Sequence, residues 1–185
     1  MNSNFVVEIL KYFAKYPAKN GVLKCFTRSN EKLSGYNTLR TYMNALPSPG
    51  LFPEIETFIF TTDSTKLENY VRNAKGYIML IEFGQLVGSA PDSMKSVDID
   101  WYFAVTIARA ADPANTDAIE EAIISSTSLD LCVNILKQMR LDDVEICHKR
   151  QNLESDVILS PVEPAMLLNN VGWTFTFKKN LDNIF

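Results

Sequence analysis

The sequence has few of the residues from which metal and phosphate sites are built. Its 185 residues include one histidine, His148, so a zinc site with several histidine ligands is excluded. The cysteines, Cys25, Cys132 and Cys147, show no CxxC spacing, which argues against a zinc knuckle or a disulfide framework and suits a reducing compartment. The seven glycines form no phosphate-binding loop, and GxSxG, GxGxxG and HExxH motifs do not occur. We therefore expect no metal, no cofactor and no catalytic centre.

Clustered charge and long apolar runs are also lacking. The 18 basic residues stand against 22 acidic ones, and the basic residues never gather in a run, which disfavours sequence-specific nucleic-acid binding. No apolar run approaches the roughly 18 residues of a membrane span. Glu8 and Lys11 interrupt the apolar residues near the start, which is unlike a secretion signal. With 46% hydrophobic and 22% charged residues, the composition predicts a single soluble domain over residues 1–185.

The first part of the chain predicts mainly short elements. Apolar residues recur at helical spacing over residues 4–16, with Ser3 as the N-cap and Pro17 ending the pattern. Three prolines and a glycine indicate an ordered loop over residues 46–53. The weaker expectations for this part are a strand over 21–27, a helix around 36–43, a strand over 58–61 and a helix over 65–71.

Two segments in the middle of the chain have clear strand patterns. Residues 77–83 are almost wholly apolar, which predicts a central strand buried on both faces and ended by Gly84. Residues 97–107 alternate, so that one face is apolar and the other is wetter. The apolar face carries Ile99, Trp101, Phe103, Val105 and Ile107, and the wetter face carries Asp98, Asp100, Tyr102 and Thr106. The connection over residues 85–96 is too long for a tight turn and predicts a projecting hairpin arm.

The last part predicts one or two helices followed by strands. A helix begins at Asp112 and Pro113 and runs to about Arg140, with a possible break over residues 125–128. Its expected apolar stripe consists of Ile119, Ala122, Ile123, Leu129, Val133, Leu136 and Met139. Strands are expected over 144–148, 157–159 and 172–178, the last with Trp173, Phe175 and Phe177 on one face. The order predicts a two-layer α+β fold, with a mainly antiparallel sheet, helices packed on one face, and Trp101 and Phe175 in the core.

A few polar residues are candidates for a metal-binding or catalytic site. Asp98 and Asp100 point the same way on a strand, as a cation site or an acid/base pair requires, but without a third ligand the polar face of a strand is favoured. Glu82 stands in an apolar run and is interpreted as a strand-end or interface residue whose pKa shifts if it is buried. Cys147 and His148 are neighbours on an expected strand and so face opposite sides, which excludes a dyad between them.

The arm is the expected interaction site. Hairpin loops usually have two to five residues, so the extra length suggests a use in assembly, although a surface loop without a partner is an equally good interpretation. The residues expected to contact a neighbouring chain are Gln85, Leu86, Val87, Met94 and Lys95.

Several segments resemble the tail-terminator or tail-completion proteins of long-tailed bacteriophages, or those of a related prophage or contractile-injection element. The matching pieces are GYIMLIEFG, the arm, DIDWYFAVTIARA, the helix that begins at Pro113, and NNVGWTFTFKKN, together with the first helix. The resemblance implies a ring, with a hexamer as the candidate size, that caps the tail tube and joins it to the head connector, with no catalytic residue. It also implies that the protein belongs to the virion tail and is assembled in the bacterial host cytoplasm. Its partners would be further copies of itself, the tail tube and connector proteins, with no membrane among them.

Two other functions remain open. An intracellular ligand-binding or regulatory domain could use the same architecture, with a cleft beside Glu82. An enzyme with an unrecognised site is the least favoured.

Overall fold

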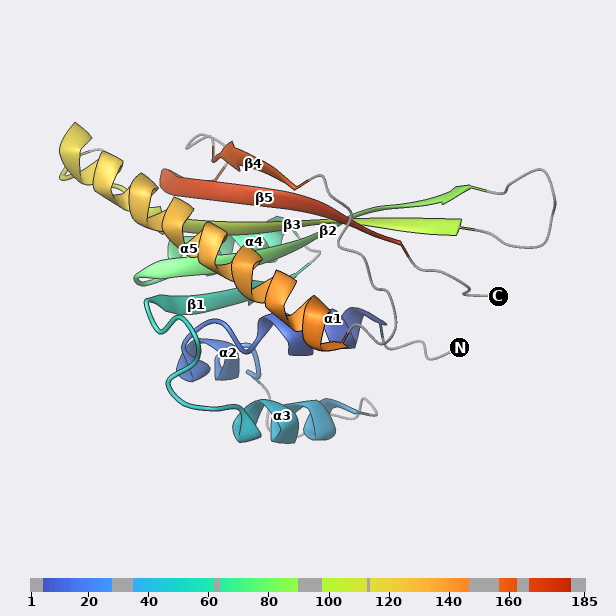
Figure 1. Cartoon of the computed structure of the whole chain (residues 1–185). Helices are drawn as coiled ribbons and strands as arrows, with labels where there is room; N and C mark the ends of the chain where they lie inside the picture. The colour runs from blue at the N-terminus through green and yellow to red at the C-terminus, as the bar shows by residue number, and fades with distance from the viewer. Residues whose placement is uncertain are drawn as a thin grey trace.

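The computed structural model of the chain describes residues 5–27, 35–61, 64–89, 98–112, 114–146, 157–162 and 167–180. The elements are α1 (Phe5–Phe13), α2 (Lys19–Leu23), α3 (Tyr36–Ala45), β1 (Ile55–Phe60), α4 (Ser64–Arg72), β2 (Tyr77–Ser89), β3 (Asp98–Ala110), α5 (Ala118–Ile146), β4 (Ile158–Pro161) and β5 (Asn170–Asn180). Five strands and the helices packed on them give an α+β fold, as predicted (Figure 1). None of the helices in the described ranges is both long and apolar enough to cross a membrane.

The sheet has the strand order β1-β2-β3-β5-β4. All neighbouring pairs are antiparallel except β1 and β2, which are parallel and are joined through α4, as a parallel pair requires. The expected mainly antiparallel sheet and the β2–β3 hairpin are therefore confirmed. At Gly172 the strands β3 and β5 approach so closely that a Cβ atom would collide with the carbonyl oxygen of Ile107.

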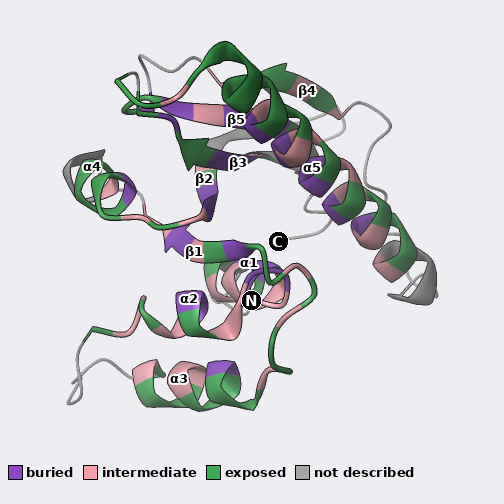
Figure 2. Cartoon of the chain, turned by 90° about the vertical axis from the view of Figure 1, so that its left-hand side faces the viewer, coloured by how far each residue is buried: buried purple, intermediate pink, exposed green. Residues whose placement is uncertain are grey.

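One face of the sheet, here called the closed face, is covered by helices. Figure 2 shows α5 crossing β3 and β5, while α1 lies beside β1 on the same side. The main core fills the space between the sheet and these helices, where the ring of Phe177 stacks on Phe103 and contacts the tilted ring of Phe13. Phe175 is fully buried in this core, as predicted; the side chain of Trp101 lies outside the described residues.

The opposite face, here called the open face, is covered only in part. Here α4 packs through Val71 and Leu67 on a small cluster that includes Ile78, Leu80 and Ala108. The expectation that the helices lie on one face is therefore corrected at α4, because the parallel crossover from β1 to β2 carries this helix over the other side (Figure 2). Away from α4, Tyr102 and Thr176 remain exposed on this face.

The short elements of the first part are confirmed with one exception. α1, α3, β1, α4 and the loop over residues 46–53 lie where the sequence predicts them. Residues 19–23, however, form α2 rather than a strand. This helix packs along β1, where Ala18 donates its backbone N–H to Ile55 O at 2.8 Å and only a glycine fits at position 21 against Glu56 O. Tertiary packing, not local preference, decides the conformation here.

The boundaries of α5 and β2 differ from those predicted from the sequence. α5 begins at Ala118, where Asp117 accepts the backbone N–H groups of Ile119 and Glu120, so the helix starts later than Pro113. The helix continues without the break considered over residues 125–128. Thr127 and Ser128 donate their hydroxyl groups to the carbonyl oxygens four residues earlier, so these side chains do not cap a second helix. It ends at Ile146, which replaces the strand expected from residue 144. Gly84 does not end β2 but lies at a bulge between Phe83 and Leu86.

Candidate assembly surface

The β2–β3 hairpin continues past the end of β1 as a ribbon, defined by residues 86–89 and 98–101, whose base at positions 100 and 101 is still paired with β5. After the bulge, Leu86 pairs with Trp101 and Ser89 with Asp98. β1 accompanies β2 only as far as Ile81, and β5 accompanies β3 only as far as Asp100. Figure 1 shows these two strands projecting well past the helices. Residues 85–89 of the predicted arm therefore belong to β2, and residues 90–96 lie outside the described residues.

The structure describes three of the five predicted interaction residues, and these lie at the start of this projection. Gln85 lies in the bulge, and Leu86 and Val87 lie in the paired part of the ribbon. Met94 and Lys95 fall outside the described residues.

Strand pairing assigns ribbon positions to the two faces of the sheet. Paired residues share a face, and successive residues alternate. Leu86, Trp101 and Lys179 form one cross-strand row, which continues the closed face. Val87 and Asp100 form the next row, which continues the open face. By the same alternation, positions 98 and 100 of β3 belong to the rows that continue the open face.

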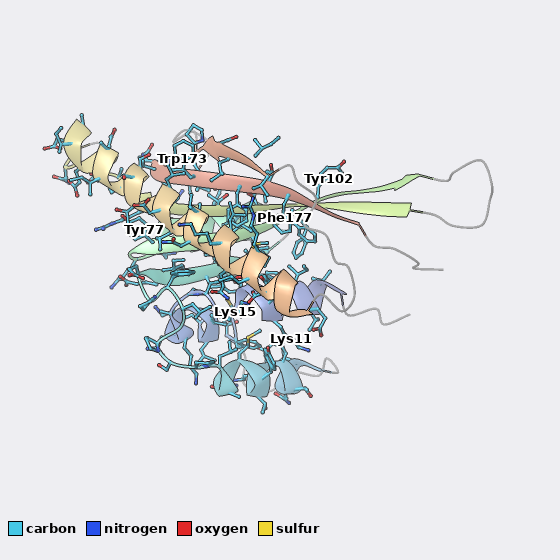
Figure 3. The ribbon with its side chains drawn as sticks, in the orientation of Figure 1. Lys11, Lys15, Tyr77, Tyr102, Trp173 and Phe177 are labelled. Atoms are coloured by element: carbon cyan, nitrogen blue, oxygen red, sulfur yellow. The ribbon has the colours of Figure 1, made fainter. Side chains whose placement is uncertain are left out.

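The open face presents a mixed polar and apolar surface at the base of the ribbon. Tyr102 is 44% exposed and Ile158 of β4 is 63% exposed. Figure 3 shows Tyr102 and Phe177 on opposite sides of the sheet. Glu82 lies on the same face as Tyr102, next to Thr106, which shares a hydrogen bond of 2.7 Å with Thr174. Glu82 occurs in an apolar run of the sequence, but its side chain is not buried among those residues, because Ile81 and Phe83 lie on the closed face.

The carboxyl group of Glu82 still responds to its surroundings. The neighbouring strands partly desolvate it, which raises its pKa, and a hydrogen bond to Thr106 acts in the opposite direction but is weaker. The net pKa lies above the ordinary value for glutamate.

The described thiols are packed rather than poised for reaction. Cys132 is fully buried on α5 and donates to the carbonyl oxygen of Trp173 at 3.5 Å, while burial raises its pKa to about 12. Burial raises the pKa of Cys25 to about 11. Both thiols are protonated at neutral pH, and Cys132 behaves as the small apolar residue expected of it. Cys147 and His148 fall outside the described residues.

A polar cluster fastens α1 to the end of α5. The carboxylate of Asp142 accepts hydrogen bonds from Lys15, from the hydroxyl of Tyr12 at 2.7 Å and from the amide of Gln138 at 3.0 Å. The Lys15 ammonium also lies 4.1 Å from the centre of the Tyr12 ring. Desolvation alone would raise the pKa of Asp142, but these three donors outweigh it and hold the pKa below its ordinary value. The cluster sets the position of α1 on the closed face.

The first turns of α5 carry an apolar pair that the sequence pattern assigned wrongly. Ile119 is 71% exposed, Ile123 is 60% exposed and Ala122 is exposed as well, although all three were expected in the buried stripe. The stripe that is actually buried consists of Ile124, Ser128, Leu131, Cys132, Ile135 and Met139. At about 100° per residue, Ile119 and Ile123 fall on the opposite side of the helix from these residues. Stricter use of helical periodicity would have found this exposed pair.

Comparisons of the chain with protein-family models, with curated proteins and with solved structures give no match.

Proposed function

We propose that the chain is a structural assembly protein of a bacteriophage tail or a related particle. In this role, copies of the chain form a ring that ends the tail tube and joins it to the head connector. The single observation that carries the proposal is the ribbon, which projects beyond the helices (Figure 1). A two-stranded hairpin is only marginally stable by itself in water, so packing on another chain would stabilise it.

The order of elements lends further support. A leading helix, a long antiparallel hairpin, a helix and a closing strand are the features expected of a tail-terminator protein, and α1, β2–β3, α5 and β5 follow that order. In this role the partners are further copies, the tail tube and the connector, and the protein resides in the virion tail.

The ligand-binding alternative has less support. Small-molecule sites are concave and enclose most of the ligand, whereas Glu82 and Tyr102 are exposed on a sheet surface.

Sedimentation of the purified chain tests the proposal directly. We expect a closed oligomer whose mass is a small integer multiple of 20.9 kDa. A chain that remains monomeric at every concentration, and in the presence of tail tubes, would contradict the proposal.

The role of the ribbon is tested by shortening it in register. Replacing residues 87–100 with Asn-Gly joins Leu86 to Trp101, which are already paired, by a two-residue turn of the kind that hairpins favour. The helix-covered core is untouched, so the melting temperature of the monomer should remain near that of the unaltered chain, while ring formation and tail joining are lost. If the shortened chain assembles and completes particles normally, the ribbon has no role in assembly.

A further inference from the structure

The first turns of α5 carry an exposed apolar pair in an acidic setting. Ile119 and Ile123 are one helical turn apart, so their side chains are neighbours on the helix surface. Residues 110–136 contain no basic residue and five acidic ones, all of them exposed: Asp112, Asp117, Glu120, Glu121 and Asp130. A partner for this surface therefore needs positive charge around a place that accepts two isoleucine side chains.

The region of α2 and α3 has the opposite charge. Residues 19–46 contain one acidic residue, Glu31, and five basic ones: Lys19, Lys24, Arg28, Lys32 and Arg40. No acidic residue occurs within α2 or α3 themselves. Lys24 is exposed and Arg40 is half-buried, while the ammonium of Lys19 lies 2.6 Å from the carbonyl oxygen of Asn44 near the end of α3. The two regions are therefore complementary in charge.

The outer side of α3 offers a place for the two isoleucines. Met43 is buried towards the core. On the side of the helix away from it, three exposed residues with short side chains lie three and four positions apart: Thr38, Thr41 and Ala45. The ring of Tyr42, which is 43% exposed, borders this stripe. Because the side chains of the stripe are short, a second helix can approach closely and bury apolar area beside the ring.

The two surfaces lie on opposite sides of the molecule. Figures 1 and 2 show α2 and α3 at the bottom and the first turns of α5 at the top, in views that differ by a turn about the vertical axis. The surfaces cannot meet within one chain, but they can meet between successive copies. A symmetric contact would instead set the acidic surface against itself. The head-to-tail contact uses two different patches, and it closes into a ring when the rotation between copies allows.

We infer that the first turns of α5 of one copy dock on the outer side of α3 of the next copy. The inference rests on the proposed function, to which it adds a contact between copies that is made by helices. Ile119 and Ile123 pack on the short side chains of α3 beside Tyr42, and the acidic residues of α5 attract the basic residues of α2 and α3. Every copy in a ring then both presents its α5 and receives the α5 of a neighbour.

The first experiment reverses the charge of each surface separately. The acid-reversed chain carries Glu120→Lys and Glu121→Lys, and the base-reversed chain carries Lys24→Glu and Arg40→Glu; none of the four side chains is fully buried. Either change sets like charges against each other in the contact. The dissociation constant for self-association, measured by sedimentation, should therefore rise by at least about 100-fold for each chain.

The second experiment combines the two reversals. A chain with all four substitutions again has opposite charges on the two surfaces, and so does an equimolar mixture of the acid-reversed and base-reversed chains. Both should associate again. The matched control, Glu54→Lys with Glu68→Lys, changes the net charge as the acid-reversed chain does, but at exposed positions outside residues 19–46 and 110–136. It should assemble like the unaltered chain.

The third experiment tests the apolar part of the contact without a change of charge. Ile119→Gln with Ile123→Gln places good helix formers at exposed positions, so this chain should fold even if a charge-reversed chain does not. Loss of the two aliphatic side chains from the contact should raise the dissociation constant by at least about tenfold.

The outcomes separate this inference from the proposed function. If the acid-reversed chain or the glutamine variant assembles like the unaltered chain while the ribbon-shortened chain does not, the helix contact is wrong and the proposed function stands. If the chain with four substitutions melts like the unaltered chain but remains a monomer, the pairing of these two surfaces is overturned. If the unaltered chain never assembles, both ideas fail.

Discussion

The two faces of the sheet differ in how completely the chain covers them. The closed face packs aromatic and branched side chains against α1 and α5, and most of its described apolar strand residues are buried or partly buried in that core. Among the described residues, the open face is covered by α4 together with Leu167 and Val162, so a small apolar cluster gives way to exposed residues such as Tyr102 and Thr176. The same strands therefore hold the fold together on one side and offer a surface to solvent on the other. Three substitutions test how differently the two faces contribute to stability.

The largest effect is expected at Phe175 on the closed face. Its ring is fully buried and stacks with Phe177 at a centroid distance of 6.0 Å. Phe175→Ala should lower the free energy of unfolding by about 3–5 kcal/mol, because the lost apolar contact leaves a cavity that the core fills only in part. The matched control is Thr176→Ala, one residue along on the open face, which should change it by less than about 0.5 kcal/mol. Equal losses in urea unfolding would mean that the two faces are not distinct.

An intermediate effect is expected at Asp142, which fastens α1 over the closed face. Asp142→Asn removes the charge that Lys15 and Tyr12 contact and should cost about 1–2 kcal/mol at neutral pH. The exposed pair of Lys11 and Glu8, 2.7 Å apart, provides the control, since Glu8→Gln should cost less than about 0.5 kcal/mol.

The cost of losing Asp142 should also depend on pH. Because its pKa is lower in the folded chain than in the unfolded one, the charged form stabilises the fold above the unfolded value of about 3.9. That stabilisation is lost as the pH falls through the folded pKa. Melting temperatures of Asp142→Asn and the unaltered chain should thus converge in acid. A constant gap down to pH 2 would show that the charge is not the cause.

The smallest effect, with the opposite sign, is expected at Glu82 on the open face. Its pKa is raised in the folded chain, so ionisation destabilises the fold above that pKa, and the penalty disappears below the unfolded value of about 4.3. Glu82→Gln should therefore raise stability at neutral pH by no more than about 0.5 kcal/mol and have no effect near pH 3. A loss of stability at neutral pH would mean that the hydrogen bond to Thr106 outweighs desolvation.

The sequence predicts the conformation of a segment well where the residues that contact it are close in the sequence, and poorly where they are distant. The alternation around Phe103 and Phe175 follows from the pleat of a strand, and both strands lie where it predicts them. α2 was missed because its conformation depends on the fit of Gly21 against β1, which no local pattern records. The partial cover of the open face was missed for a similar reason, since the position of α4 follows from the parallel pairing of β1 with β2.

The candidate site was predicted in part. The length of the connection after Gly84 pointed to a projecting arm, but the strands extend further into it than the glycine suggested, because a bulge accommodates Gly84 without ending the pairing. Ile119 and Ile123 were assigned to the core because they are apolar, although their spacing from Ser128 places them outside the stripe. For these residues periodicity is a better guide than hydrophobicity alone.

The place of β5 between β3 and β4 has a consequence for synthesis of the chain. A ribosome has already made β1, β2, β3 and the whole of α5 before β5 appears, yet β3 finds its second partner only in β5, where Ala110 pairs with Asn170 and Val105 with Phe175. Closing such a distant pairing makes folding slow, because chain entropy is lost before the contacts form. A nascent chain that stops within α5 leaves one edge of β3 and much of the aromatic core without cover. The chain is thus expected to reach its stable form only after β5 has been synthesised and has left the ribosome.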